Sequence, residues 1–193
     1  MSLDNKTVVA VTGLPGSGKS TFLRVAKELG YHLIVMGDFV REEAARRNLP
    51  PTAVNMGELM FQMRKERGED FIAQLTVEKA EKMKTDFIVI DGVRNPEEVE
   101  KFKKTFKNFY LIAIDSTAEL RFKRIRRRFR SDDSTDRDKF EEREARELKV
   151  GVGRAMALAN LIIDNNSSLG EFKAKVKNVL EEIMRGFSHA DKC

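Results

Sequence analysis

The stretch "TVVAVTGLPGSGKSTFLRVAKELG", residues 7–30, decides the fold class of this chain. It begins with an apolar, β-branched run that is typical of a buried strand, and it ends in a segment suited to a helix. Between them, "GLPGSGKS" at residues 13–20 matches the pattern G-x-x-x-x-G-K-[ST] at every fixed position. Loops with this pattern, placed between a strand and a helix, cradle the phosphates of a nucleotide.

Each fixed residue of this loop has a chemical reason. Glycines let the backbone approach the phosphates, so that successive N–H groups and the positive end of the following helix face the anion. The Lys19 ammonium can reach the β- and γ-phosphates, and the Ser20 hydroxyl can bind Mg²⁺. We therefore predict ATP and Mg²⁺ as ligands, with Lys19 also active in catalysis. The predicted ATP-binding residues of the loop are Gly13, Pro15, Gly16, Ser17, Gly18, Lys19, Ser20 and Thr21.

Four further apolar segments follow and alternate with helical ones. The predicted strands cover residues 6–12, 31–36, 86–91, 109–115 and 160–164. Their near-continuous apolar runs indicate a parallel sheet that is buried on both faces, and the segments between them predict right-handed crossover helices. We expect an α/β fold of three layers around a five-stranded parallel sheet.

Two segments exceed the minimal alternation of strand and helix. Residues 39–83 read as helices that break at "NLPPT" and near Gly68, and residues 129–147 are almost entirely charged. A length of 193 residues still corresponds to one domain, so we expect residues 1–193 to form a single domain with these two segments as insertions.

Composition narrows the cellular setting and the partners. The longest apolar runs are too short to cross a membrane, and the sequence enters its first strand too early for a signal peptide. The only cysteine is Cys193, which suits a reducing compartment, so we expect a cytoplasmic protein. The net charge is +5, but acidic residues follow the basic run 121–130 at once and would repel a nucleic-acid backbone. We expect neither a membrane nor a nucleic-acid partner, and the oligomeric state stays open.

A carboxylate for the metal ion is expected at the end of another strand. "FIVIDG" ends the predicted strand 86–91 with Asp91. The carboxyl ends of parallel strands lie at the same edge of a sheet, so Asp91 should lie near the phosphate loop. A carboxylate at this place holds Mg²⁺ through water, and we predict Ser20 and Asp91 as the metal site.

Kinases, switch GTPases, motors and remodelling ATPases all share such a phosphate loop. The N-K-x-D motif of guanine recognition is absent from this sequence, and the chain is short for a motor. Arginines are spaced along it instead: Arg41 follows the second strand, Arg94 follows the third, and seven basic residues fall within 121–130. Phosphoryl transfer needs positioned positive charge and little covalent chemistry, so this spacing favours a kinase.

These motifs together resemble the adenylate-kinase and nucleoside monophosphate kinase group. The matching parts are the phosphate loop, G-D-x-x-R at 37–41, D-G-x-R at 91–94, and the arginine-rich stretch. The resemblance implies that 39–83 binds the acceptor, that 129–147 forms a lid, and that Arg41 and Arg94 hold the acceptor phosphate. Its lid arginines are implied to surround the transferring phosphate: Arg124 at ATP, Arg128 with Arg94 in catalysis, Arg130 and Arg143 at the acceptor, and Arg127 and Arg146 nearby.

The C-terminal third is similar to a second group, dephospho-coenzyme A kinase. The similarity lies in "ALANLIIDNNSSLGEFKAKVKNVL" at 157–180, and it implies that Asn165 lies near the donor adenine. Over nearly its whole length the chain resembles an archaeal family of adenylate-kinase-related, dephospho-coenzyme-A-kinase-like proteins, with "DGVR", "RSDD" and "VGxGRAxALA" in common. Departures are a D-G-x-R motif one residue shorter than in adenylate kinases, and Asn160 in place of an aspartate.

Asp38 distinguishes the two enzymatic alternatives. A hydroxyl acceptor such as dephospho-coenzyme A needs a base, and Asp38 could accept its proton. A phosphate monoester has a second pKa of about 6, so a monophosphate acceptor needs no base, and Asp38 would then position Arg41, water or Mg²⁺. Two arginines favour a phosphorylated acceptor, AMP first. The third alternative is a nucleotide-binding regulator or assembly ATPase that engages a partner on closure.

Overall fold

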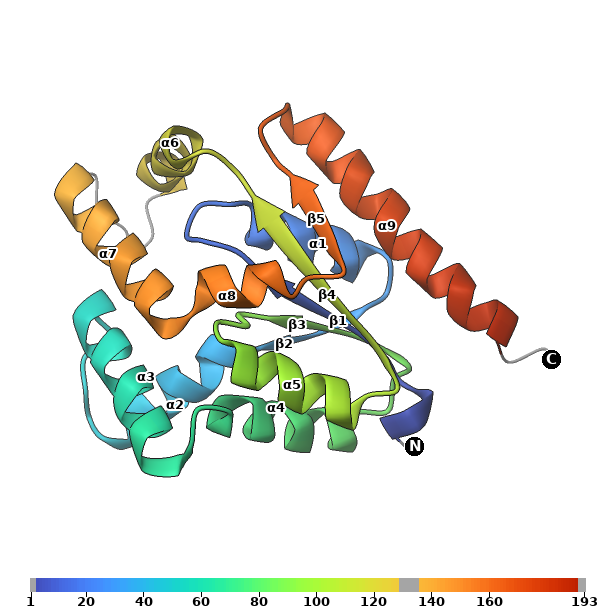
Figure 1. The fold of residues 1–193 in the computed structure, drawn as a ribbon, viewed down its shortest axis with the longest axis horizontal. Coiled ribbons are helices and arrows are strands. Elements are labelled where there is room, and N and C mark those ends of the chain that lie inside the picture. The colour runs from blue at the N-terminus through green and yellow to red at the C-terminus, as the bar shows by residue number, and fades with distance from the viewer. Residues whose placement is uncertain (1–2, 129–135, 191–193) are drawn as a thin grey trace.

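The computed structural model describes residues 3–128 and 136–190, which form a parallel sheet between layers of helices (Figure 1). The strands are β1 (Thr7–Thr12), β2 (His32–Val35), β3 (Phe87–Asp91), β4 (Asn108–Asp115) and β5 (Leu161–Asp164). They lie in the order β2-β3-β1-β4-β5, and every neighbouring pair is parallel. The predicted α/β class and the five-stranded parallel sheet are confirmed.

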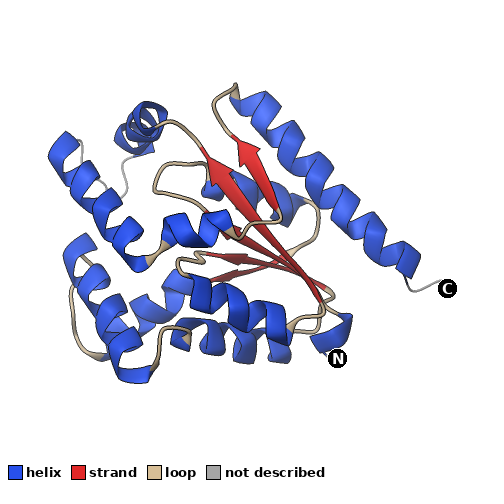
Figure 2. Cartoon of the chain, in the orientation of Figure 1, coloured by secondary structure: helices blue, strands red, loops and turns tan. Residues whose placement is uncertain are grey.

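Helices fill the connections between the strands, as the colours in Figure 2 show. A short 3₁₀ helix, η1 (Leu3–Asn5), precedes β1. The α-helices are α1 (Lys19–Glu28), α2 (Met36–Arg46), α3 (Ala53–Arg67), α4 (Phe71–Lys82), α5 (Pro96–Thr105), α6 (Ala118–Arg128), α7 (Arg137–Val150), α8 (Val152–Ala157) and α9 (Leu169–Ala190). The predicted interruptions at "NLPPT" and near Gly68 are the two turns that separate α2, α3 and α4.

The central strand β1 is buried along its whole length. Its successive side chains point to opposite faces, so Val8 and Ala10 join one apolar core while Val9 and Val11 join the other. This is the reason that the sequence of β1 is a continuous apolar run rather than an alternating one.

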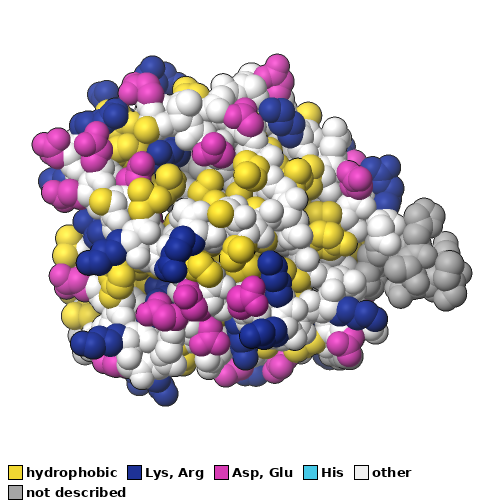
Figure 3. Space-filling view, viewed as in Figure 1, with side chains coloured by type: hydrophobic (Ala, Val, Ile, Leu, Met, Phe, Trp, Pro, Cys, Tyr) yellow, Lys and Arg dark blue, Asp and Glu magenta, His cyan; other side chains and the backbone are white. Residues whose placement is uncertain are grey.

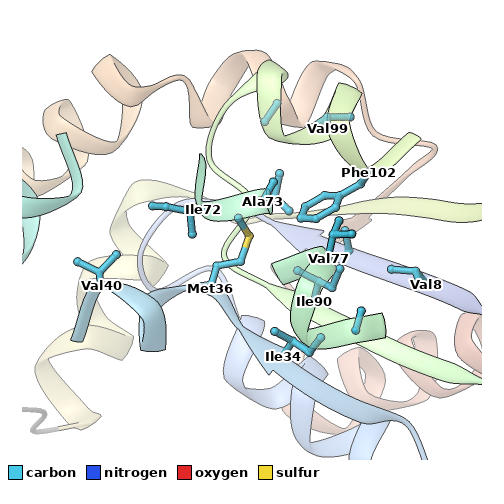
Figure 4. Packing of buried hydrophobic residues seen from close by; sticks show 14 of the residues in the cluster. Val8, Ile34, Met36, Val40, Ile72, Ala73, Val77, Ile90, Val99 and Phe102 are labelled. Carbon is cyan, nitrogen blue, oxygen red and sulfur yellow. The ribbon is translucent and has the colours of Figure 1, made fainter. Parts of the chain in front are cut away.

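Different helices cover the two faces of the sheet. On one face α1 and α9 pack together, and Phe22, Phe172 and Leu180 are fully buried between them and the strands. On the other face α2, α4, α5 and α8 surround the cluster drawn in Figure 4, which contains Met36 and Phe102. Full burial of one such side chain contributes about 1.5–3 kcal/mol to folding.

The methionines of α3 belong to this second core. Met60 and Met63 are buried, and Met56 packs against the cluster as a partly buried side chain. The methionines at helical spacing on α3 therefore belong to the apolar core. Helix α4 lies on β2 and α5, so the C-terminal part of the segment 39–83 covers the sheet, while α3 packs on α2 and α4.

Local capping fixes two of the helix starts. The Asn95 side chain accepts a hydrogen bond from the Glu98 backbone N–H at 2.8 Å, and Pro96 follows at the first helical position of α5. At α9, the Ser168 and Glu171 side chains each accept a hydrogen bond from the other's backbone N–H. Both starts use side chains that lie within three residues along the chain.

The carboxyl ends of the strands define one edge of the sheet. Asp91 at the end of β3 lies in register between Val11 of β1 and Val35 of β2. The phosphate loop follows β1, and α2 begins directly after β2, so both start at this edge. In open parallel sheets this is the edge where ligands bind. Within residues 3–128 and 136–190, none of the helices combines the length and the apolar character needed to cross a bilayer.

Candidate functional site

A cavity of about 850 Å³ opens at the carboxyl edge of the sheet. The phosphate loop, the ends of β2 and β3, and the helices α6 and α7 all contribute to its walls. Many of the site residues predicted from the sequence meet here: Gly13, Pro15, Gly16, Gly18, Lys19, Ser20, Thr21, Arg41, Asp91, Arg94, Arg124, Arg127, Arg128, Arg143 and Asn165. Ser17 is buried beneath the loop and lies outside this lining.

The loop geometry requires glycine at position 18, which the pattern fixes, and also at position 16, which the pattern leaves open. Gly16 and Gly18 have φ values of 82° and 121°, which side chains rarely adopt. A Cβ atom at Gly16 would lie 2.6 Å from the Arg121 carbonyl oxygen, and one at Gly18 would lie 2.2 Å from Asn165 Nδ2. The loop therefore packs against α6 and the end of β5 with no space for a side chain at either position.

Lys19 is held by the loop that it serves. Its ammonium donates hydrogen bonds to the carbonyl oxygens of Gly13 at 2.5 Å and Leu14 at 3.2 Å. Burial lowers the pKa of Lys19 to about 8, and Asp91 and Glu147 only partly offset this by favouring the charged form. A phosphate anion in the cavity would supply the missing negative charge and favour the ammonium.

Asn165 ties the phosphate loop to the neighbouring strand ends. Its side-chain amide donates to the Ser17 carbonyl oxygen at 2.7 Å, and its own carbonyl oxygen accepts from Arg124 at 2.7 Å and from the Ser116 hydroxyl at 3.1 Å. Asn165 is buried. The residue predicted near the adenine therefore lies against the backbone of the loop, at one wall of the cavity.

Asp91 and Ser20 fit a magnesium ion. Asp91 Oδ1 is buried and, among the described residues, lacks a hydrogen-bond partner. A buried carboxylate oxygen without a partner is costly, so an ion or an ordered water here would stabilise it. The described part of the chain holds no cluster of three or more metal-binding side chains. Phosphate-bound Mg²⁺ needs only one or two protein ligands because phosphate oxygens and water complete its coordination.

Arg94, one of the arginines that line the cavity, forms hydrogen bonds through both its side chain and its backbone. Its Nε donates to Glu147 Oε2 at 2.9 Å, and its Nη1 donates to the Gly92 carbonyl oxygen at 3.1 Å. The Arg94 backbone N–H donates to Glu98 Oε2 at 2.7 Å, which fixes the turn between β3 and α5. The charge of Glu147 raises the pKa of Arg94, so its guanidinium stays charged in the buried site.

Glu147 is a site residue that the sequence analysis did not identify. It extends from α7 into the cavity wall beside Lys19, Arg94 and Arg143. Burial opposes its ionisation, but the charges of Arg94, Lys19 and Arg143 outweigh burial and lower its pKa. In the sequence it is one of several acids in "EEREARELK", and nothing in that pattern separates it from the exposed ones.

Asp38 and Arg41 form an ion pair three residues apart on α2. Both side chains are exposed, and Arg41 lines the cavity, whereas Asp38 is absent from its lining. Within the described part of the chain, the Asp38 carboxylate forms its ion pair with the guanidinium of Arg41. The role of Asp38 as a base stays a prediction.

The arginines of the basic helix α6 lie in different surroundings. Arg124, Arg127 and Arg128 line the cavity. Arg121, one turn earlier on the helix, is buried and donates to the Ser116 carbonyl oxygen at 3.0 Å and to Glu144 at 2.5 Å. It therefore joins α6 to α7. Of the predicted lid, Arg130 and the rest of residues 129–135 lie outside the described residues, and 137–147 belong to α7.

A smaller cavity of about 130 Å³ adjoins the first. Val40, Met56, Met60 and Phe61 from α2 and α3 supply apolar walls. Four arginines and one glutamate supply the charged ones: Arg41, Arg94, Arg143, Arg146 and Glu147. Three of these arginines and Glu147 also line the larger cavity, so the two spaces meet at the Arg94–Glu147 pair.

The chain belongs to the UPF0200 family. A UPF0200 protein of Methanothrix thermoacetophila is 43% identical over 92% of this chain and 98% of its own length. One of Methanoregula boonei is 40% identical, with 92% and 98% covered. A UPF0200/UPF0201 protein of Archaeoglobus fulgidus is 41% identical over 92% of this chain, which spans only 56% of that longer relative. A family profile described as an AAA domain also matches residues 12–142.

Three solved structures, two of them shikimate kinases, share the fold over most of this chain. Shikimate kinase from Bacteroides thetaiotaomicron superposes with a TM-score of 0.59 at 14% identity, over 92% of this chain and 98% of that one. Shikimate kinase from Acinetobacter baumannii gives 0.56 at 12% identity, over 99% and 98%. TT1252 from Thermus thermophilus gives 0.59 at 20% identity, over 92% and 97%. The chain has a P-loop kinase-like fold.

Proposed function

We propose that this chain, a UPF0200 protein with a P-loop kinase-like fold, transfers the γ-phosphoryl group of MgATP to a small phosphorylated acceptor. The observation that carries the proposal is the meeting of two phosphate-binding groups in one cavity. The phosphate loop with Lys19 forms one wall, and Arg41, Arg94 and Arg143 form another. Hydrolysis of a nucleotide requires no site for a second phosphorylated molecule, whereas an acceptor with its own phosphate requires cations that hold that phosphate.

The donor side acts by holding charge. Backbone N–H groups of residues 13–20 and the start of α1 face the β- and γ-phosphates, with Lys19 bridging them. Mg²⁺, when bound at Ser20 and Asp91, neutralises phosphate charge and orients the transferring group. Arg124, Arg127 and Arg128 from α6 stabilise the negative charge of the transition state and exclude water.

The acceptor side favours a compact molecule with a phosphate. Arg94 presents a guanidinium suited to two parallel hydrogen bonds with a phosphate. The adjoining cavity of about 130 Å³ is apolar on the side of α2 and α3. A nucleoside monophosphate such as AMP, with its base directed toward this cavity, is the acceptor that we favour.

Dephospho-coenzyme A is the second candidate acceptor. It also carries phosphates for Arg41 and Arg94, but its hydroxyl requires a base. Asp38 would have to leave its ion pair with Arg41 to serve as one. A regulatory or assembly ATPase is the third candidate, and it predicts turnover that depends on a macromolecular partner rather than on an acceptor.

One assay separates these candidates. ADP release is followed with MgATP and, in turn, a panel of nucleoside monophosphates, dephospho-coenzyme A, shikimate, or no acceptor. AMP-dependent ADP release is expected, and EDTA should abolish it. Arg94→Ala should reduce kcat/KM for AMP by roughly ten- to a hundredfold, the value of a charged hydrogen bond in a buried site.

Arg46→Ala is the matched control. Arg46 lies on α2, the helix that also carries Arg41. Its side chain is exposed, pairs with Glu43, and lines neither the 850 Å³ nor the 130 Å³ cavity. Its removal should leave turnover unchanged. ADP release that ignores every acceptor, or that requires added protein or RNA, would refute the proposed reaction.

A further inference from the structure

The Arg94–Glu147 ion pair occupies the junction of the two cavities. Glu147 Oε2 lies 2.9 Å from Arg94 Nε, and both side chains are mostly buried, with exposed fractions of 18% and 26%. Lys19 and Arg143 act electrostatically on the same carboxylate. A carboxylate among three cations that line a phosphate cavity has the surroundings that a phosphate oxygen would need.

We infer that Glu147 is a built-in anion that takes the place of the acceptor phosphate until the acceptor displaces it. This rests on the proposed role of Arg94 as a phosphate ligand. With Glu147 in place, the Arg94 guanidinium is charged and oriented. A buried guanidinium without an anionic partner would destabilise the fold, and Glu147 supplies that partner. Nε of Arg94 carries a single hydrogen, which Glu147 accepts, so a phosphate dianion that binds at this nitrogen takes the place of the carboxylate.

The displacement couples the acceptor to α7. Glu147 lies in the last turns of that helix, and Gly151 ends it with a φ of 122°. The Arg121–Glu144 and Arg137–Glu119 pairs join α7 to α6, and the Arg94–Glu147 pair joins α7 to the β3–α5 turn. Release of the Arg94–Glu147 pair frees one attachment of α7 while its attachments to α6 persist. Acceptor binding thus changes how firmly α7 is held, and α7 carries Arg143.

Glu147→Gln tests this exchange because it removes the charge and keeps the shape. Inorganic phosphate is titrated into the nucleotide-free protein by calorimetry. The variant should bind phosphate about tenfold more tightly or better than wild type, since a charged hydrogen bond no longer competes. Glu147→Ala should show the same direction, which covers the case in which the glutamine variant folds poorly.

Glu141→Gln is the matched control. Glu141 lies on the same helix and also pairs with an arginine, Arg137 at 2.8 Å, but it is exposed and lines neither cavity. The Glu141→Gln variant should bind phosphate with the affinity of wild type. In the double variant Arg94→Ala/Glu147→Gln the gain should vanish, which locates the bound phosphate at Arg94 rather than at the phosphate loop.

Hydrogen exchange supplies a second readout. Phosphate should reduce the protection of amides in the C-terminal half of α7 in wild type, and should change it little in Glu147→Gln. Phosphate affinity that is equal or weaker in Glu147→Gln, or a gain that survives Arg94→Ala, would overturn the inference. These titrations contain no ATP, so they hold whether or not AMP proves to be the acceptor.

Discussion

Removal of Arg64 should destabilise the whole chain, because it leaves a buried carboxylate without its partner. Arg64 on α3 and Glu98 on α5 form an ion pair at 2.5 Å, with side-chain exposures of 2% and 0%. The second oxygen of Glu98 accepts the Arg94 backbone N–H at 2.7 Å. This buried pair therefore joins α3 to α5 and also fixes the turn that carries Arg94.

The expected cost follows from burial. Breaking a buried ion pair by removing one partner costs about 3–5 kcal/mol, because the remaining charge loses its compensation. In Arg64→Met the Glu98 carboxylate keeps the Arg94 N–H but loses its only charged partner among the hydrogen bonds and ion pairs described here. For a chain of this length each kcal/mol shifts Tm by about 2–4 °C, so we expect a fall of roughly 6–20 °C.

The double variant Arg64→Met/Glu98→Leu separates charge from packing. Replacing both members of a buried pair by apolar residues is often neutral or stabilising. Two atoms of the Arg64 guanidinium group, Nε and Nη1, are buried and have no hydrogen-bond partner among residues 3–128 and 136–190, which strengthens this expectation. The double variant should therefore be close to wild type in free energy of unfolding, within about 1 kcal/mol.

Urea unfolding followed by circular dichroism measures both variants, with thermal melts in parallel. A loss below about 1 kcal/mol in Arg64→Met would refute the reasoning, because surface ion pairs are worth that little. A loss this small would mean that water enters and solvates Glu98, so that its charge is not left uncompensated. A double variant as unstable as the single one would show that the shape of the arginine matters, rather than the uncompensated charge.

Two further predictions concern the nucleotide. The pKa of Lys19 is about 8 in the empty site, and bound phosphates should raise it. Nucleotide affinity should therefore fall as pH rises from 7 to 9. Calorimetry in buffers of different ionisation enthalpy should show that protons are taken up on binding near pH 8. Binding without proton uptake would contradict the burial of Lys19. Asn165→Ala removes the buried hydrogen bond to the Ser17 carbonyl oxygen, so nucleotide Kd should rise by roughly three- to tenfold in a fluorescent nucleotide titration, and Tm should fall by roughly 2–12 °C in a thermal melt. An unchanged Kd would mean that the loop keeps its shape without Asn165.

The charge distribution agrees with a small-molecule ligand. On the face shown in Figure 3, acidic and basic side chains are interspersed around an apolar centre and do not form one basic surface. The basic residues of α6 that matter for the site, Arg124, Arg127 and Arg128, line the cavity. The absence of a nucleic-acid partner stays a prediction.

Local sequence determined much of this protein. The apolar runs and the loop at 13–20 depend on neighbours along the chain, so they predicted the parallel sheet and the glycine-rich turn between β1 and α1 directly. The caps at Asn95 and Ser168 were readable for the same reason. Parallel strands end at one edge, which sufficed to bring Asp91 and Arg94 to the loop.

Tertiary structure alone decided which charges face one another. Arg121 and Arg124 lie three residues apart and look alike in sequence, yet one is buried against Glu144 and the other holds Asn165. Glu147 reaches Arg94 across 53 positions of sequence. Such pairs depend on how helices from distant segments pack, and burial then multiplies the strength of each charge. No local pattern contains that information, so the anion within the arginine group became visible only in the folded chain.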